Sequence, residues 1–311
     1  MAIYNVNGDN ITVASNLFVS VKDYGAKGNG TTDDASAIQD ALDAVKNTGG
    51  IIYFPIGTYL LKSPVLFYSN QTLWFENGSK LLQGAAINNL LRAYSESTWT
   101  AYNGVHDCLI YGAVFDGGAY TTANTLVGIS HSKNIVFKNC AFKNGYSNWH
   151  NLEINSSYNV KVINCDFEGS RRTLDGEMIQ IDAAAEQSVY PWDNVNYDDT
   201  VCKYIEVCGC IFHNSTTVPA IGNHRNSYHD FIKIHDNIFD GLTGTRGAID
   251  ILSRTTNVDI YNNTFNGCTI GILTTGSTFY INNNRFVDVT TAVSGSTGVV
   301  HANMINGTYT A

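Results

Sequence analysis

The stretch "NVKVINCDFEGS", residues 159–170, returns in altered form along the chain, and this recurrence decides the fold. Similar segments are "NIVFKNCAFKNG" (134–145), "YIEVCGCIFHNS" (204–215), "FIKIHDNIFDGL" (231–242), "NVDIYNNTFNGC" (257–268) and "TFYINNNRFVDV" (278–289), with looser copies at 108–118 and 299–308. One aligned position is aromatic: Phe115, Phe142, Phe167, Phe212, Phe239, Phe265 and Phe286, with Ile305 last. Self-similarity at a nearly constant period indicates a repeat architecture.

The length and composition of the repeats predict which architecture it is. The aligned aromatics are 27, 25, 45, 27, 26, 21 and 19 residues apart, and the 45 contains one insertion. From Phe142 onward, a cysteine or an asparagine stands two residues before the aligned position: Cys140, Cys165, Cys210, Asn237, Asn263, Asn284 and Asn303. In stacked coils equivalent positions lie ~4.8 Å apart, so Phe can stack on Phe and Asn can bond to Asn. We therefore expect an all-β fold, a right-handed single-stranded parallel β-helix.

A solenoid must cover its open hydrophobic end. The strongest helical pattern is "TTDDASAIQDALDAVKNT", residues 31–48, in which Ile38, Ala41, Leu42 and Val45 share one face. We expect a capping α-helix at about residues 33–47. The predicted organisation is an N-terminal extension at 1–18 and one β-helix domain at 19–311, with a loop inserted at about 183–203.

The composition limits which classes of partner the protein is expected to bind. The chain has 311 residues, is 44% hydrophobic and carries a net charge of −9, so neither nucleic acid nor a membrane is an expected partner. The start shows no Sec-type signal peptide, and the seven cysteines are expected to be buried thiols. No cofactor and no metal site is expected, because Cys140, Cys165 and Cys210 lack metal-ligand spacing.

A second strand in each repeat carries polar side chains. Aligning "TLVGISHS" (125–132), "NLEINSS", "EMIQIDA", "PAIGNHR", "GAIDILS" and "IGILTTG" places Val127, Leu152, Ile179, Ile221, Ile249 and Ile272 inward. The first outward column is then Gly128, Glu153, Gln180, Gly222, Asp250 and Leu273, and the second is Ser130, Asn155, Asp182, His224, Leu252 and Thr275. Acids, amides and a histidine gather on adjacent rungs, whereas the flanking rungs carry Ser, Gly, Leu and Thr. The pattern predicts a polar patch on one sheet face.

The patch suits carbohydrate chemistry. Glu153 and Asp182 would lie ~8 Å apart on a flat sheet, within the range for the two carboxyl groups of an inverting glycosidase. Glu177 is the reserve candidate for either catalytic role, and retaining chemistry stays open. A solvated sheet face with a ladder of polar side chains is the alternative interpretation. The candidate substrate-binding residues are Trp149, His150, Asn155, Gln180, Tyr190, Trp192, His224, Arg225, Asp250 and Arg254.

Residues 21–61, with Asp-Tyr-Gly-Ala, Thr-Asp-Asp and Phe-Pro-x-Gly-x-Tyr in order, resemble the opening of the pectate-lyase-like β-helix superfamily. That superfamily includes polygalacturonase-related enzymes and phage tailspike depolymerases. The combination "HNLEIN…EMIQIDAA…CKYIEV…AIGNHR" resembles polygalacturonase-related proteins of Gram-positive bacteria and their phages. This resemblance implies a carbohydrate-active site at His150, Glu153, Glu177, Gln180, Asp182 and His224. The Asn-Thr-Asp, Asp-Asp, Gly-His-Gly and Arg-Ile-Lys motifs of true polygalacturonases are missing, which argues against pectin.

Three functions follow as hypotheses. The first is a glycoside hydrolase that cleaves a cell-surface or plant-type polysaccharide through paired carboxylic acids. The second is a polysaccharide lyase acting on a uronate-containing glycan, and the third is a tail-spike protein that binds glycan without cutting it. The expected partner is a polysaccharide, the expected location is extracellular or on a virion, and a homotrimer is the assembly that the resemblance to tailspikes implies.

Overall fold

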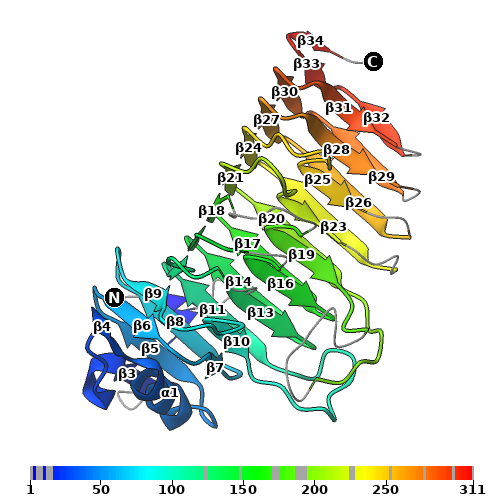
Figure 1. The fold of residues 1–311 in the computed structure, drawn as a ribbon. Coiled ribbons are helices and arrows are strands. Elements are labelled where there is room, and N and C mark those ends of the chain that lie inside the picture. The colour runs from blue at the N-terminus through cyan, green and yellow to red at the C-terminus, as the bar shows by residue number, and fades with distance from the viewer. Residues whose placement is uncertain are drawn as a thin grey trace.

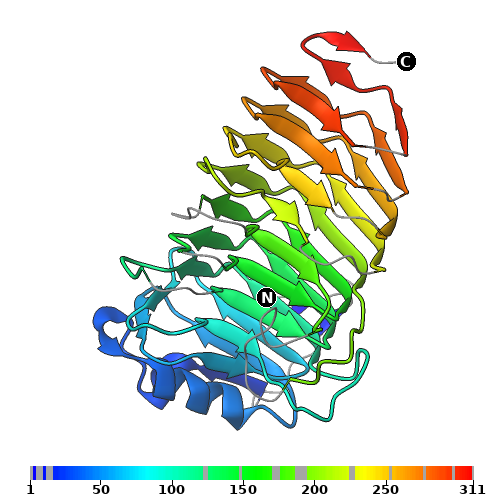
Figure 2. The ribbon, with the colours of Figure 1, turned by 45° about the vertical axis from the view of Figure 1, so that its right-hand side comes forward.

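The computed structural model describes residues 3–4, 10–11, 17–121, 125–146, 149–169, 176–185, 195–223, 228–251, 254–275, 278–295 and 298–309. The chain winds into a stack of coils whose strands form three long sheets, and the two ends of the stack lie far apart (Figures 1 and 2). In these sheets neighbouring strands come from successive coils and run parallel, except for the last strand of one sheet, so the expected β-helix is confirmed.

The nine-stranded sheet carries the polar patch. Its strands, from the N-terminal coil onward, are β7 (Val65–Phe67), β10 (Leu91–Ala93), β13 (Val127–Ser130), β16 (Leu152–Asn155), β19 (Ile179–Asp182), β22 (Ile221–Gly222), β25 (Ile249–Ile251), β28 (Ile270–Thr274) and β31 (Thr291–Ser294).

The other two sheets complete each coil. The eleven-stranded sheet contains β3 (Phe18–Ser20), β5 (Gly50–Phe54), β8 (Gln71–Phe75), β11 (His106–Tyr111), β14 (Lys133–Lys138), β17 (Tyr158–Ile163), β20 (Lys203–Cys208), β23 (Asp230–His235), β26 (Thr256–Tyr261), β29 (Phe279–Asn282) and β32 (Val299–His301). The twelve-stranded sheet contains β4 (Asn29–Asp33), β6 (Thr58–Leu61), β9 (Lys80–Gln83), β12 (Val114–Asp116), β15 (Ala141–Lys143), β18 (Asp166–Glu168), β21 (Ile211–His213), β24 (Ile238–Asp240), β27 (Thr264–Asn266), β30 (Arg285–Val287), β33 (Met304–Ile305) and an antiparallel end strand, β34 (Thr308–Tyr309). A separate pair, β1 (Ile3–Tyr4) and β2 (Asn10–Ile11), is antiparallel.

The aromatic column predicted from the repeats is confirmed. Phe142 stacks on Phe167 with centroids 4.5 Å apart, and the column continues through Phe212 and Phe239 to Phe265 and Phe286 at 4.7–5.0 Å. These rings are fully buried. Apolar side chains from every coil form one continuous core along the stack.

The asparagine column is also confirmed. The Asn263 side-chain oxygen accepts from the Asn237 backbone N–H at 3.0 Å, and the pattern repeats between Asn263 and Asn284 and between Asn284 and Asn303. Cys210 joins the column by donating its backbone N–H to Asn237 at 2.9 Å. All seven cysteines are free thiols in the structure, and all except Cys208 are buried.

The capping helix is shorter than expected. α1 covers Ala35–Ala44, with Ile38, Ala41 and Leu42 buried against the first coils, instead of residues 33–47. It begins later because Asn29–Asp33 pairs as β4 with β6. The Asp34 carboxylate accepts from the backbone N–H groups of Lys27 and Gly28 and makes no capping bond to the helix. Within the described ranges no helix is long and apolar enough to cross a membrane.

Candidate functional site

The register of the nine-stranded sheet brings the polar patch together as predicted. Val127, Leu152, Ile179, Ile221, Ile249 and Ile272 are successive Cα partners, so the inward column is confirmed. The outward column Gly128, Glu153, Gln180, Gly222, Asp250 and Leu273 follows from the same pairings. In the second column Ser130 pairs with Asn155, and Asn155 with Asp182, while His224 and Leu252 lie outside the described residues.

The patch is not a solvated sheet face. Glu153, Glu177 and Asp182 have 0% of their surface exposed, and Asp250 has 2%. The alternative interpretation, a solvated sheet face with a ladder of polar side chains, is therefore wrong. Alternation fixes which face a side chain occupies, whereas burial depends on what lies over that face.

Two neutral donors hold the Glu153 carboxylate. The Thr125 hydroxyl donates to Oε2 at 3.1 Å, and the Asn155 amide donates to Oε1 at 2.8 Å. Thr125 comes just before β13, one rung below, and Asn155 is two residues further along β16. Donors aimed at both oxygens fix the orientation of this carboxyl group.

Asp182 lies beside a buried histidine. Its Oδ1 accepts from the Ala183 backbone N–H at 3.0 Å, and its Oδ2 accepts from the Gln180 amide at 3.3 Å. His229 Nδ1 accepts from the Cys202 backbone N–H at 2.9 Å, so the ring proton of neutral His229 is on Nε2. That Nε2 lies 3.7 Å from Asp182 Oδ1, and both side chains are fully buried. The ring therefore presents an N–H to the carboxylate.

One guanidinium joins two further acids. Arg246 donates from one terminal nitrogen to Glu177 Oε1 and from Nε to Asp250 Oδ2. Burial would lower the pKa of Arg246, but the charges of Glu177 and Asp250 outweigh this effect and raise it. The side chain of Arg246 is 22% exposed, whereas that of Glu177 is fully buried. The positive charge of Arg246 therefore lies at the partly exposed edge of the patch, in contact with the two acids.

His150 and Gly222 shape the surroundings of Glu177. His150 Nδ1 lies 3.0 Å from the Glu177 carbonyl oxygen and 3.6 Å from Glu177 Oε2. A Cβ at Gly222 would come within 2.4 Å of the Asp250 backbone oxygen and 3.0 Å of Glu177 Cγ. The gap in the outward column at Gly222 is thus filled by Glu177.

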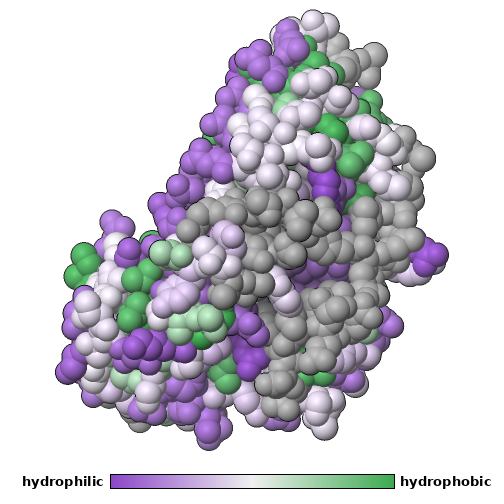
Figure 3. Space-filling model, viewed as in Figure 1, coloured by the Kyte–Doolittle hydropathy of each residue, from purple (hydrophilic) through white to green (hydrophobic). Residues whose placement is uncertain are grey.

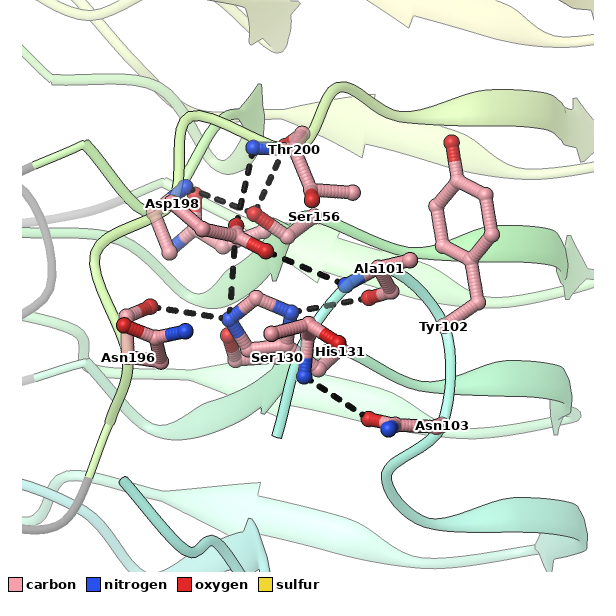
Figure 4. A network of polar contacts seen from close by, with 12 residues as sticks. Ala101, Tyr102, Asn103, Ser130, His131, Ser156, Asn196, Asp198 and Thr200 are labelled. Carbon is pink, nitrogen blue, oxygen red and sulfur yellow. Dashed lines mark hydrogen bonds and ion pairs between the residues drawn. The ribbon is translucent and has the colours of Figure 1, made fainter. Parts of the chain in front are cut away.

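The described end of the inserted loop is tied to neighbouring coils (Figure 4). The buried His131 ring contacts the carbonyl oxygens of Ala101 and Asn196 at 2.8 and 2.9 Å. Asp198 accepts from the backbone N–H of Ala101 at 3.1 Å, and Ser156 donates to the Thr200 carbonyl at 2.7 Å. Residues 195–202 are therefore held against the ends of β13 and β16.

The remaining predicted residues are only partly tested. Trp149 is half-buried beside His150, and the exposed Arg254 lies 5.3 Å from the ring centroid of Tyr228. Tyr190, Trp192, His224 and Arg225 lie outside the described residues. The prediction that they contact sugar stays a prediction.

Sequence reasoning missed three charged or titratable residues. Arg246 lies four residues before Asp250, outside the aligned strands, and His229 directly precedes β23 of the eleven-stranded sheet. Arg92 on β10 pairs with Gly128 and so extends the outward column by one rung. The signal for Arg92 was available, because "LLRAYS" aligns with the later second strands. Nothing in the spacing of Arg246 or His229 indicated the direction of the side chain.

The fold and this patch define the class: a parallel β-helix protein with a buried, acid-rich site on one sheet. A model of the family described as rhamnogalacturonase A/epimerase, pectate lyase-like, matches residues 18–310, and the chain belongs to that family.

Among curated relatives, the plasmin and fibronectin-binding protein A of Streptococcus pneumoniae is 31% identical over 278 residues, 76% of this chain and 38% of that protein. The preneck appendage protein of Bacillus phage PZA is 23% identical over 265 residues, 82% of this chain and 27% of that protein. The chain thus spans well under half the length of both.

Two solved structures have the same fold. The crystal structure of PfbA, a surface adhesin of Streptococcus pneumoniae, aligns with a TM-score of 0.71 at 24% identity over 92% of this chain and 78% of that one. A family 28 exopolygalacturonase of Yersinia enterocolitica aligns with a TM-score of 0.68 at 15% identity over 95% of this chain and 64% of that one. At these identities the likeness shows the fold alone.

Proposed function

We propose that the chain is a polysaccharide-cleaving enzyme, a glycoside hydrolase whose acid–base pair is Glu153 and Asp182. The observation that carries the proposal is the burial of four carboxyl groups on the rungs from β16 to β25: Glu153, Glu177, Asp182 and Asp250. Taking charged groups out of water is expensive, and a buried ion pair contributes little net stability. The rung directly below Glu153 carries Gly128 and Ser130, which are uncharged, so the coil geometry does not require a charge at these positions. Clustered buried acids are typical of catalytic sites.

The contacts divide the acids into two groups. Arg246 binds Glu177 and Asp250, so these two are occupied in holding a cation. Glu153 and Asp182 are oriented by neutral donors, and on a flat sheet their Cβ atoms would be ~8 Å apart. That separation is typical of an inverting glycosidase, in which one carboxyl group is the general acid and the other activates a water that attacks the sugar. Glu177 remains the reserve for either role.

Glu153 and Asp182 have no exposed surface. Cleavage therefore requires a change of conformation that exposes both carboxyl groups when glycan binds. Arg246, at the partly exposed edge, is the charged group that an arriving acidic sugar would meet first. The lyase alternative would use that guanidinium to neutralise a uronate carboxylate. Two protein carboxylates already neutralise it, which favours the hydrolase.

The second candidate function is binding of glycan on a host surface without cleavage, by an extracellular or virion-associated protein. The relatives favour it, because they are a bacterial surface adhesin and a phage appendage protein. Among the residues coloured in Figure 3, apolar ones are scattered and polar ones prevail, which suits a polar ligand such as glycan. A homotrimer stays the proposed assembly.

Incubation with a panel of bacterial and plant polysaccharides tests these functions. Hydrolysis releases new reducing ends without new ultraviolet absorbance, whereas a lyase also creates an unsaturated, absorbing product. Binding of a polysaccharide without any product supports the second candidate. No binding and no cleavage across the panel would contradict both.

A further inference from the structure

A second cluster of reactive side chains lies on the eleven-stranded sheet, away from the acid-rich patch. Glu206 and Cys208 are two residues apart on β20, and His235 is on the adjacent β23. Within the described part of the chain this is the one group of three His, Cys, Asp or Glu side chains whose ligand atoms all lie within 4.8 Å of one another. The sequence did not reveal it, because its members come from different coils.

The backbone places the three side chains firmly on one face. Residues two apart on a strand point the same way, so Glu206 and Cys208 share a face. Cys208 and His235 are direct Cα partners in the parallel pairing of β20 with β23. Sites built on strands hold their geometry better than sites on loops.

Hydrogen bonds already orient the histidine as a metal ligand is usually oriented. His235 Nδ1 lies 2.7 Å from Asp236 Oδ2, and the ring is stacked on Tyr261 with centroids 4.6 Å apart. A carboxylate only accepts, so Nδ1 carries the proton and donates it to Asp236. Carboxylates hold metal-binding histidines in this way from behind the metal site.

The other ring nitrogen faces a second acceptor. His235 Nε2 lies 3.1 Å from Glu206 Oε1. Since Nδ1 donates to Asp236, Nε2 is the ring nitrogen that would bind a metal cation, and Glu206 Oε1 is within reach of the same cation. Lys161 binds the other oxygen, Glu206 Oε2, at 3.0 Å and leaves Oε1 for a cation.

Cys208 supplies the third donor. It is the one cysteine of the seven that is not buried. Its Sγ lies within 4.8 Å of the ligand atoms of Glu206 and His235, and a thiol gives up its proton when it binds a metal. Thiolate, imidazole and carboxylate together are a ligand set that zinc prefers.

We propose that Glu206 Oε1, Cys208 Sγ and His235 Nε2 bind one Zn²⁺ ion, with water in the fourth position. On binding, the Cys208 thiol releases its proton to solvent and the Sγ–Zn bond forms. Asp236 is a positioning residue that holds the ring. The ion joins two successive coils on the outside of the stack.

The test is calorimetric titration of Zn²⁺ into protein that lacks a polyhistidine tag and has been freed of metal with a chelator. The expected result is one ion per chain. Cys208→Ser and His235→Ala should each weaken binding at least tenfold, and Asp236→Asn should weaken it about 10- to 100-fold, as loss of a supporting carboxylate does. A Zn²⁺-dependent rise in Tm, absent from Cys208→Ser, is the second readout.

The matched control is His106→Ala. His106 Nδ1 lies 2.8 Å from the carboxylate of the next residue, Asp107, just as His235 Nδ1 lies beside that of Asp236. His106 is on the same sheet but does not belong to the proposed zinc site. This variant should bind Zn²⁺ like the wild type. The proposal is overturned if the wild type gives no binding heat, or if Cys208→Ser and His235→Ala bind as the wild type does.

Discussion

At the scale of single residues, Arg246 decides the electrostatics of the patch. Its guanidinium contacts Glu177 and Asp250, both of which are almost completely buried. Without Arg246, the carboxylates of Glu177 and Asp250 would lose this cation and stay in a site with little water. Such groups then either take up protons or destabilise the fold.

Arg246→Gln should therefore lower the free energy of unfolding by about 3–5 kcal/mol, the typical loss when one partner of a buried ion pair is removed. Urea denaturation measures it. Lys143→Gln is the control, because Lys143 forms an exposed pair with Glu168 at 3.6 Å and should change stability by less than about 1 kcal/mol. Equal, small effects of both variants would contradict the buried-ion-pair account.

Individual site residues could be predicted only where the strand fixes their direction. Glu153, Gln180 and Asp182 were placed correctly, because the period of two and the in-register stacking leave one choice of face. Arg246 and His229 lie in connections or at strand starts, where long side chains reach across coils. Their contacts depend on side-chain geometry that no spacing rule supplies.

At the scale of elements, the asparagine column connects the turns of successive coils. The Asn263 side chain accepts from Asn237, donates to the Ile234 carbonyl at 2.9 Å and donates to Asn284 at 3.0 Å. These partners are buried, so water cannot replace a lost bond.

Asn263→Ala should reduce the free energy of unfolding by about 2–6 kcal/mol, since each orphaned buried polar group costs about 1–3 kcal/mol. Thermal or urea unfolding provides the measurement. Asn266→Ala, which removes an exposed contact to Asp240, should stay within about 0.5 kcal/mol of the wild type. If Asn263→Ala is as mild as this control, the column is not a stabilising element.

The segment 195–202 depends on Asp198. Burial alone would raise the pKa of Asp198, but hydrogen bonds from the backbone of Thr200 and Ala101 and the nearby His131 lower it below its ordinary value of 3.8. A carboxyl group with a lowered folded-state pKa stabilises the fold above its unfolded pKa and loses this effect as the pH falls through the folded pKa.

Asp198→Asn should lower the hydrogen-exchange protection of the Ala101 and Thr200 amides about tenfold or more at neutral pH, because a bond to a charged group contributes about 1.5–3 kcal/mol. Wild-type protection at these amides should fall toward that of the variant only below about pH 3.8. Equal protection in both proteins at neutral pH would show that Asp198 does not hold this segment.

The elements themselves were largely predictable, because stacking repeats one local pattern. Phe167 and Asn237 could be assigned to columns since a parallel β-helix keeps equivalent residues in register. The ends of α1 were not predictable in the same way. The Asp34 carboxylate accepts from the backbone of Lys27 and Gly28 within the first coil and makes no capping bond to the helix.

At the scale of the whole molecule, the stack is a rigid frame for a site built from several coils. One core runs along the chain, so side chains from β13 to β25 keep fixed positions relative to one another. Membership of the rhamnogalacturonase A/epimerase, pectate lyase-like family agrees with such a frame. The family and the stack do not determine the sugar, since one fold carries many chemistries.

The central claim is that Glu153 and Asp182 cleave glycan. The measurement is the rate of reducing-end release from a polysaccharide that the wild type cleaves, compared with Glu153→Gln and Asp182→Asn, with circular dichroism to establish that both variants fold. Each variant should lose about 10²–10⁴-fold in rate, the usual contribution of a general acid or base. Folded variants that cleave at the wild-type rate would contradict the claim.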